Sequence, residues 1–151
     1  MRRFLLVGLF LGGIAASNTA AAQAGISLGA AVGSTWADNK LQSDDRHGLV
    51  YLRLGAPLMP FAARAEFLAF DEPGRAYDTA VIGSAVIAIN APLVQPYLLL
   101  GYGKYGLKSN VDATGVSYGA GVRIGGRLGL FVEARRHDPI NRDLISLGLA
   151  F

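Results

Sequence analysis

Hydrophobic residues recur at every second position along most of the chain. Eight such stretches are separated by turn residues, and this period of two is typical of β-strands that have one apolar face. The stretches cover residues 25–36, 47–57, 60–70, 76–89, 94–106, 115–125, 128–137 and 143–151. Glycine recurs within most of them and would cost a helix about 1 kcal/mol per position relative to alanine. The pattern therefore predicts an all-β fold.

The connections between these stretches alternate in length. Short connections follow the second, fourth and sixth stretches, at Leu58-Met59, 90–92 and Gly126-Arg127. Longer, polar connections cover 37–46, 71–75, 107–114 and 138–142. Short turns at one end and longer loops at the other are typical of outer-membrane barrels. We predict an eight-stranded antiparallel up-and-down transmembrane β-barrel with both ends of the chain on the short-turn side.

The composition of the less apolar face favours a membrane barrel over a lipocalin-like soluble one. The outer face of a soluble barrel needs many Lys, Glu, Thr and Gln residues, whereas this face carries mostly Gly, Ala and Ser. Small residues suit the crowded lumen of an eight-stranded barrel. Both faces are apolar in the fourth and fifth stretches, so the facing of these two strands is left open.

Six charged residues share this less apolar face. They are Arg53, Arg64, Glu66, Arg123, Glu133 and Arg135. An arginine that faces lipid at the bilayer midplane costs about 2 to 4 kcal/mol, so we expect all six in the lumen. Loss of one partner would strand a buried charge at a cost of about 3 to 5 kcal/mol, which favours a paired, structural network.

The first 24 residues have the features of a secretory signal peptide. Arg2 and Arg3 precede an apolar run that is too short to span a bilayer comfortably, and Ala22 to Ala24 fit a cleavage site of small residues. We predict a signal peptide at 1–24, a barrel domain at 25–151 and export of the protein.

Charge and cysteine content narrow the possible partners. Without Arg2 and Arg3, the 14 basic residues become 12 against 11 acidic ones, and the net charge falls from +3 to +1. So balanced a chain gives no reason to expect a nucleic-acid partner. Cysteine is absent, which excludes disulfides and thiolate metal sites. We predict no cofactor and no metal.

Two glycine motifs and two histidines resemble chemical sites. Residues 101–106, GYGKYG, match a dinucleotide-binding pattern but lie in a strand that leads to a loop rather than a helix, so we interpret them as strand packing. Ser117 in GVSYG likewise lacks a strand-to-helix elbow and is interpreted as a strand residue. His47 and His137 both fall at the long-loop ends of strands, where we expect solvated side chains.

The sequence resembles the small outer-membrane β-barrels that include OmpX, the transmembrane domain of OmpA and the opacity-type proteins. The resemblance is carried by QPYLLLGYG, VSYGAGVRIGGRLGLFVEARR and LISLGLAF. It implies a non-enzymatic barrel with a structural or surface-interaction role in the outer membrane, a monomer in contact with outer-membrane lipid and lipopolysaccharide. The last strand is similar to the signal that the outer-membrane assembly machinery reads. That similarity implies such a role for Ile145, Leu147, Leu149 and Phe151.

Two alternative functions stay open. The lumenal Arg and Glu residues are also compatible with a narrow ion-conducting channel. The segment RRHDP is similar in place to the catalytic histidine segment of lipid A deacylases, which implies a role for His137 alone. Pro139 occupies the position where those enzymes have a serine, and Asp143 is the nearby downstream acid.

Overall fold

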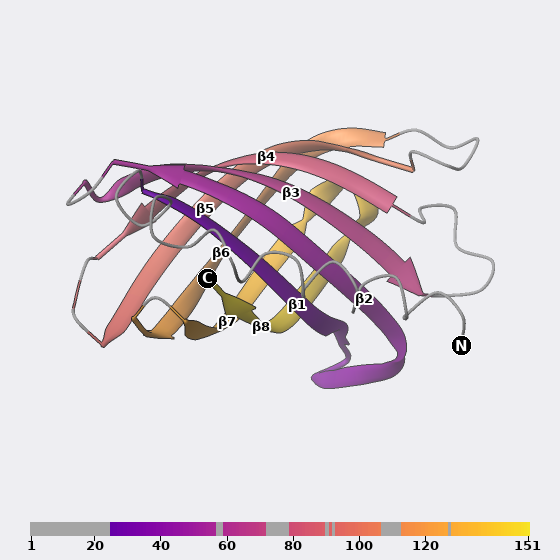
Figure 1. Cartoon of the computed structure of the whole chain (residues 1–151). Coiled ribbons are helices and arrows are strands. Elements are labelled where there is room, and N and C mark those ends of the chain that lie inside the picture. Colours follow the sequence, from indigo (N-terminus) through magenta and orange to yellow (C-terminus); the bar gives the residue numbers. More distant parts are fainter. Residues whose placement is uncertain are drawn as a thin grey trace, which may run out of the picture.

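The computed structural model describes residues 25–56, 59–71, 79–89, 91, 93–106, 113–126 and 128–151. They form a closed antiparallel barrel (Figure 1). Its strands are β1 (Ile26–Ala37), β2 (Lys40–Gly55), β3 (Phe61–Asp71), β4 (Thr79–Ala88), β5 (Val94–Tyr105), β6 (Ala113–Gly125), β7 (Gly129–His137) and β8 (Arg142–Ala150). The predicted eight-stranded up-and-down topology is confirmed. The expected signal peptide, 1–24, lies outside the described residues.

The first and last strands close the barrel. β8 pairs with β1 from Gly29 opposite Ala150 to Trp36 opposite Asp143. Beyond this ladder, the N–H of Phe151 donates to the carbonyl oxygen of Leu28 at 2.7 Å, and the N–H of Leu28 donates back at 3.1 Å. Closure satisfies the backbone groups that an open sheet edge would expose, which is the condition for a β-sheet to cross lipid.

The outer wall is apolar and the inner wall carries the charges. Leu98, Leu130 and Leu147 point outward with 55 to 61% of their surface exposed, in keeping with a lipid-facing belt. The predicted facing of the second, third, sixth and seventh strands is confirmed by alternating burial along β2, β3, β6 and β7. Register decides the two open cases: Ile82 of β4 lies opposite Glu66 and shares its inward face, and Tyr97 and Leu99 of β5 also point inward.

The connection predicted as a loop at 37–46 is instead a projecting β-hairpin, so this prediction is wrong. β1 and β2 continue to a two-residue turn at Asp38 and Asn39, whose φ angles are +52° and +58°. Asp and Asn tolerate this left-handed conformation, which a tight hairpin turn requires. The polar composition of 37–46 hid the strands. Apart from this hairpin, the strand ends lie within three residues of the predicted ones.

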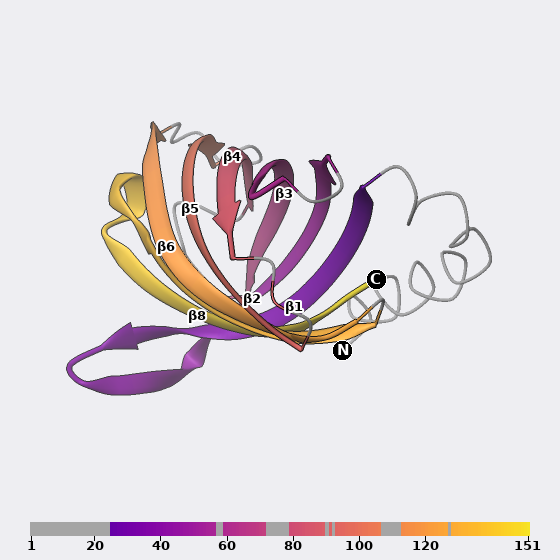
Figure 2. The ribbon, with the colours of Figure 1, turned by 90° about the vertical axis from the view of Figure 1, so that its left-hand side faces the viewer.

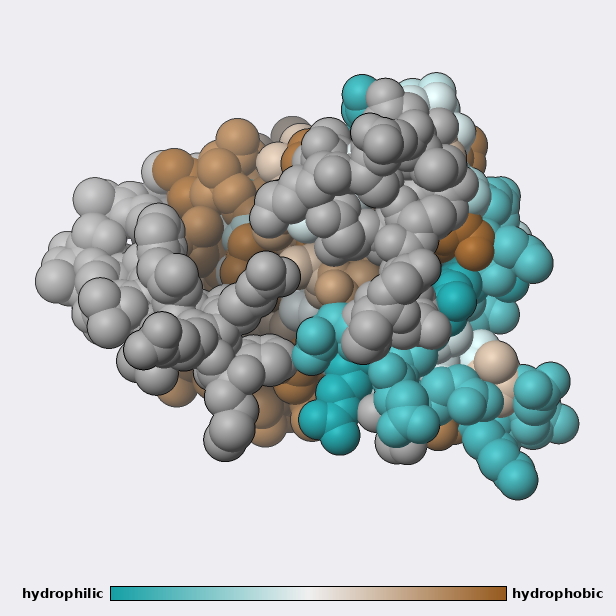
Figure 3. All heavy atoms as spheres, turned by 90° about the vertical axis from the view of Figure 1, so that its right-hand side faces the viewer, coloured by the Kyte–Doolittle hydropathy of each residue, from teal (hydrophilic) through white to brown (hydrophobic). Residues whose placement is uncertain are grey.

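The hairpin is offset from the barrel wall. The β1–β2 register shifts between Ser34 and Thr35, so that β2 carries extra residues before the pairing resumes. Figure 2 shows the hairpin extending away from the other strands. Figure 3 looks at the long-loop end of the barrel, where hydrophilic residues gather on this projection. Among the described residues, no helix is long and apolar enough to cross a membrane, and η1 (Asp138–Ile140) is a single short turn.

Candidate functional site in the barrel lumen

Four of the six predicted lumenal charges form one network across the middle of the barrel. β3 supplies Arg64 and Glu66, and β7, which lies four strands away in either direction, supplies Glu133 and Arg135. Arg64 Nη1 donates to Glu133 Oε2 at 2.5 Å, and Arg135 Nη1 donates to the two oxygens of Glu66 at 2.7 and 2.6 Å. A further pair joins Arg64 and Glu66 at 3.3 Å. We call these four residues the lumenal network.

Neutral side chains complete the lumenal network. Ser84 Oγ donates to Glu66 Oε1 at 2.5 Å, and Tyr97 donates to Glu133 Oε2 at 2.9 Å. Arg135 Nη2 donates to Ser84 Oγ and to Ser117 Oγ, each at 2.8 Å. The four charged side chains are at most 4% exposed, and their charges balance. Such extra hydrogen bonds help to offset the cost of removing buried ion pairs from water.

Sequence reasoning missed Ser84 and Tyr97 because the facing of their strands was undecided. Register would have supplied the signal. Ser84 lies directly opposite Arg64 on the neighbouring strand, and directly opposite residues share a face. Ser117 was placed correctly as a strand residue, and the structure adds its contact with Arg135.

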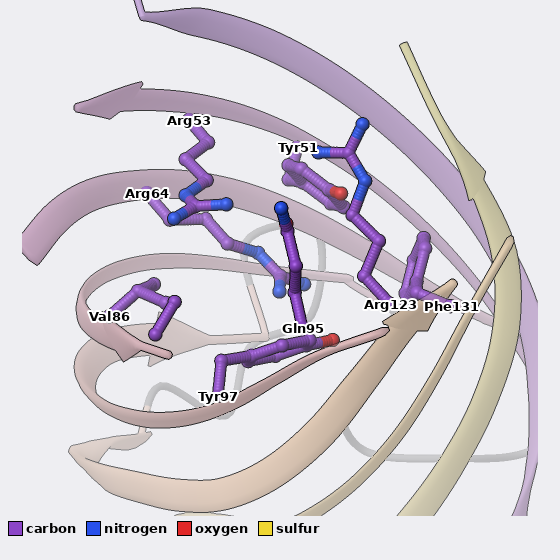
Figure 4. A pocket seen from close by; sticks show the side chains of 9 residues that line it. Tyr51, Arg53, Arg64, Val86, Gln95, Tyr97, Arg123 and Phe131 are labelled. Atoms are coloured by element: carbon purple, nitrogen blue, oxygen red, sulfur yellow. The ribbon is translucent and has the colours of Figure 1, made fainter. Parts of the chain in front are cut away.

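Arg53 and Arg123 lie apart from the lumenal network, near the short-turn end. Both are half-buried, and Arg123 Nη2 donates to the carbonyl oxygen of Gly126 at 2.8 Å. Their side chains line a small cavity of about 20 Å³ together with Tyr51, Arg64, Gln95 and Tyr97 (Figure 4). Glu66 and Glu133 do not line this cavity. The six predicted charges therefore form two groups: a balanced network and a basic mouth. We use the name basic mouth for Arg53, Arg123 and this cavity.

The long-loop half of the lumen is filled by apolar side chains and both histidines. Leu49, Leu68, Ile82 and Leu144 belong to a buried cluster with Tyr105, and this cluster extends to Tyr51 and Phe131, which line the basic mouth. We call it the apolar plug.

The expectation of solvated histidines is wrong. His47 and His137 are 3% and 1% exposed. His47 Nε2 and Ser146 Oγ form a hydrogen bond of 2.8 Å, and the Tyr105 hydroxyl and His137 Nδ1 form one of 2.7 Å. β2 begins at Lys40, so His47 lies well inside a strand instead of at its end.

Large lumenal side chains lie across from glycines on adjacent strands. Tyr51 is opposite Gly29, and Tyr97 is opposite Gly121. A Cβ atom at either glycine would overlap the tyrosine ring. Gly101, from the motif GYGKYG, makes room for the Arg135 guanidinium in the same way. All of the motif except Gly106 lies within β5, so its prediction as strand packing is confirmed.

The geometry around His137 is that of a buried packing residue. Its ring packs edge-on against Tyr105 at 5.8 Å between centroids, on the inner wall and away from the lipid-facing side. Pro139 follows in η1. Within the described ranges, no group of three or more His, Cys, Asp or Glu side chains is placed to hold a metal ion.

The residues of the proposed C-terminal signal lie on and just beyond β8. Leu147 and Leu149 point outward and are exposed, Ile145 is partly buried on the same face, and Phe151 follows the last ladder residue. This placement agrees with the facing expected for the strand.

No family model matches the sequence, and no curated protein matches it. Among solved structures, the chain is similar to a de novo designed transmembrane β-barrel, with a TM-score of 0.63 and 14% identity over 83% of this chain and 92% of the designed one. It is also similar to Neisserial surface protein A (NspA), with a TM-score of 0.51 and 14% identity over 83% of this chain and 94% of NspA. Likeness at this identity shows the fold alone: the chain is an eight-stranded antiparallel transmembrane β-barrel.

Proposed function

We propose that this chain is a non-enzymatic outer-membrane protein with a structural or surface-interaction role. The observation that carries the proposal is the filled lumen. The lumenal network and the apolar plug together fill the interior of the barrel, so the interior serves as a core. The parts left for contact with other molecules are the lipid-facing wall and the long-loop end.

The projecting hairpin is the best candidate for surface interactions. Trp36 and Leu41 lie directly opposite each other on it and are 40% and 54% exposed. The charged residues Asp38, Lys40 and Asp44 are exposed beside them. An aromatic residue with a polar surround suits the membrane interface or a protein partner. The proposed environment of the barrel is outer-membrane lipid and lipopolysaccharide, and the proposed state is a monomer.

Membrane fractionation of a Gram-negative host that expresses the full chain tests the proposal. We expect the protein in the outer-membrane fraction, with faster migration on a gel before boiling than after it. Recovery in the soluble periplasmic fraction, without heat-modifiable migration, would refute the location.

A lipid A mass profile from the same cells tests the deacylase alternative, and we expect no change in acyl pattern between the unaltered chain and His137→Ala.

Planar-bilayer recording tests the channel alternative. A lumen occupied by ion-paired side chains predicts no steady openings. Regular openings whose conductance changes in Glu133→Gln, and not in Asp143→Asn at the barrel end, would contradict the structural role and support a channel.

We further propose that Ile145, Leu147, Leu149 and Phe151 form the signal for the outer-membrane assembly machinery. Phe151→Asp should reduce assembled barrel in cells. Folding of the same variant from urea into detergent is the control, because a recognition defect leaves folding in detergent unchanged. Equal amounts of assembled barrel in cells would contradict the proposal.

A further inference from the structure

The short-turn end of the barrel contains basic but no acidic side chains. Residues 46–65, 79–111, 113–132 and 144–151 contain neither aspartate nor glutamate. These ranges include the short turns and the strand halves that lead to them. Arg53, Arg64 and Arg123 lie within them. Glu66 and Glu133, the carboxylates that pair with Arg64, also lie within ion-pair distance of Arg135, so the charges of the network balance without Arg53.

Two of these arginines lie directly opposite each other on adjacent strands. Arg53 of β2 lies directly opposite Arg64 of β3, and like charges in this relation destabilise a sheet. Arg64 turns toward the lumenal network and packs over the Tyr51 ring at 4.0 Å. Arg53 makes no ion pair with any residue in the part of the chain that the structure describes. No ion pair with a described residue therefore balances the positive charge of Arg53.

The cavity of the basic mouth lies between these groups. Figure 4 shows Arg53, Arg64, Arg123 and Gln95 pointing into one space, from β2, β3, β6 and β5. Arg64 is 4% exposed, and its Nε atom is buried without a hydrogen-bond partner in the described structure. Guanidinium groups are donors only, and the Gln95 amide has two donor hydrogens beside its acceptor oxygen, so donors predominate in the lining of the cavity.

We propose that the basic mouth binds a small anion of the size of chloride. The volume of about 20 Å³ has room for roughly one or two water molecules, which suits a single-atom anion better than a phosphate ion. An anion there would offset the repulsion between Arg53 and Arg64 and would accept hydrogen bonds from the surrounding donors. Partial burial of the cavity makes both effects stronger than they would be in open water.

Thermal unfolding of the full chain, folded in an uncharged detergent, tests the proposal. Sodium chloride replaces sodium gluconate at constant ionic strength, so general screening of charges does not change. Gluconate serves as the reference anion because it is too large for the cavity. A ligand that binds only the folded state raises the unfolding midpoint with its concentration. We expect a saturable rise for the unaltered chain, and an apparent dissociation constant at least about tenfold higher in Arg53→Gln and Arg123→Gln because each loses a charge-assisted hydrogen bond.

Arg136→Gln is the matched control. Arg136 lies at the opposite end of the barrel, paired with Asp143 at 3.2 Å, so this variant should keep the full chloride response. An equal chloride response in all the chains, or none in the unaltered chain, would overturn the proposal, as would a saturable response to phosphate without one to chloride. If Arg53→Gln does not fold, crystals of the unaltered chain grown in bromide decide the question. An anomalous peak between Arg53 and Arg123 supports the site, and an empty cavity at saturating bromide refutes it.

Discussion

The lumenal network and the basic mouth place the same residue type on the same inward face, with opposite results. Arg64 and Arg135 are buried, and each is bonded to a carboxylate on the opposite wall of the barrel. Arg53 and Arg123 are only half-buried and lie near solvent. Depth and partner explain the difference. A buried guanidinium needs a carboxylate because water is excluded, whereas one at the mouth keeps part of its hydration. An inward arginine is thus a structural residue only where a partner reaches it.

The largest expected effect comes from breaking the lumenal network. Glu133→Gln removes the carboxylate that binds Arg64 at 2.5 Å and Tyr97 at 2.9 Å. We expect a loss of about 3 to 5 kcal/mol in the free energy of unfolding, because a buried charge loses its partner. Urea titration in detergent, read by band shift on a gel, measures it. The matched control is Asp143→Asn, an exposed partner of Arg136, for which about 1 kcal/mol or less is expected. Equal losses in the free energy of unfolding in the two variants would contradict the distinction between buried and exposed ion pairs.

Packing beside the network should be the next most sensitive feature. Gly121→Ala places a methyl group where the Tyr97 ring lies, and Tyr97 holds Glu133. We expect a loss of about 1 to 3 kcal/mol, which is typical of overpacking. Gly83→Ala is the control, because Gly83 faces outward and a Cβ there meets no atom within 4 Å. The same urea titration applies, and a Gly121→Ala variant as stable as Gly83→Ala would refute the packing account.

Removal of both members of one pair should cost less than removal of one. In Arg64→Met combined with Glu133→Leu, no uncompensated charge remains from that pair, and apolar side chains fill the space. Replacement of a buried pair by apolar residues is often neutral or stabilising, so we expect a change within about 2 kcal/mol of zero. A double-variant loss equal to the sum of the single losses would show that the two residues act independently.

The smallest expected effect lies at the basic mouth. Arg53→Gln in chloride-free buffer should change the free energy of unfolding by about 0.5 kcal/mol or less, because Arg53 is only partly buried and has no ion pair among described residues. Urea titration of the variant beside Glu133→Gln measures the contrast. A loss of several kcal/mol would show that Arg53 belongs to the network after all.

Particular residues show where sequence reasoning succeeded and where it failed. Period-two alternation identified all eight strands, and the cost of charge in lipid placed Arg64, Glu66, Glu133 and Arg135 inside. The hairpin was missed because all residues from Lys40 to Asp45 except Leu41 are polar, while Leu41 and Gln42 still pair with β1. Alternation detects a strand only where one of its faces is buried, and this segment projects beyond the barrel.

The sequence by itself determined the strand count, the antiparallel order and the inward position of the charges, since all three follow from local alternation and the cost of placing charge in lipid. Only the tertiary structure decided which charges meet. Arg64 and Glu133 are 69 residues apart and come together because β3 and β7 face each other across the closed barrel. Strand register also paired Tyr97 with Gly121, and Arg53 with Arg64 rather than with a carboxylate. Side-chain partners across a lumen depend on register and closure, which are properties of the whole sheet and of no single segment.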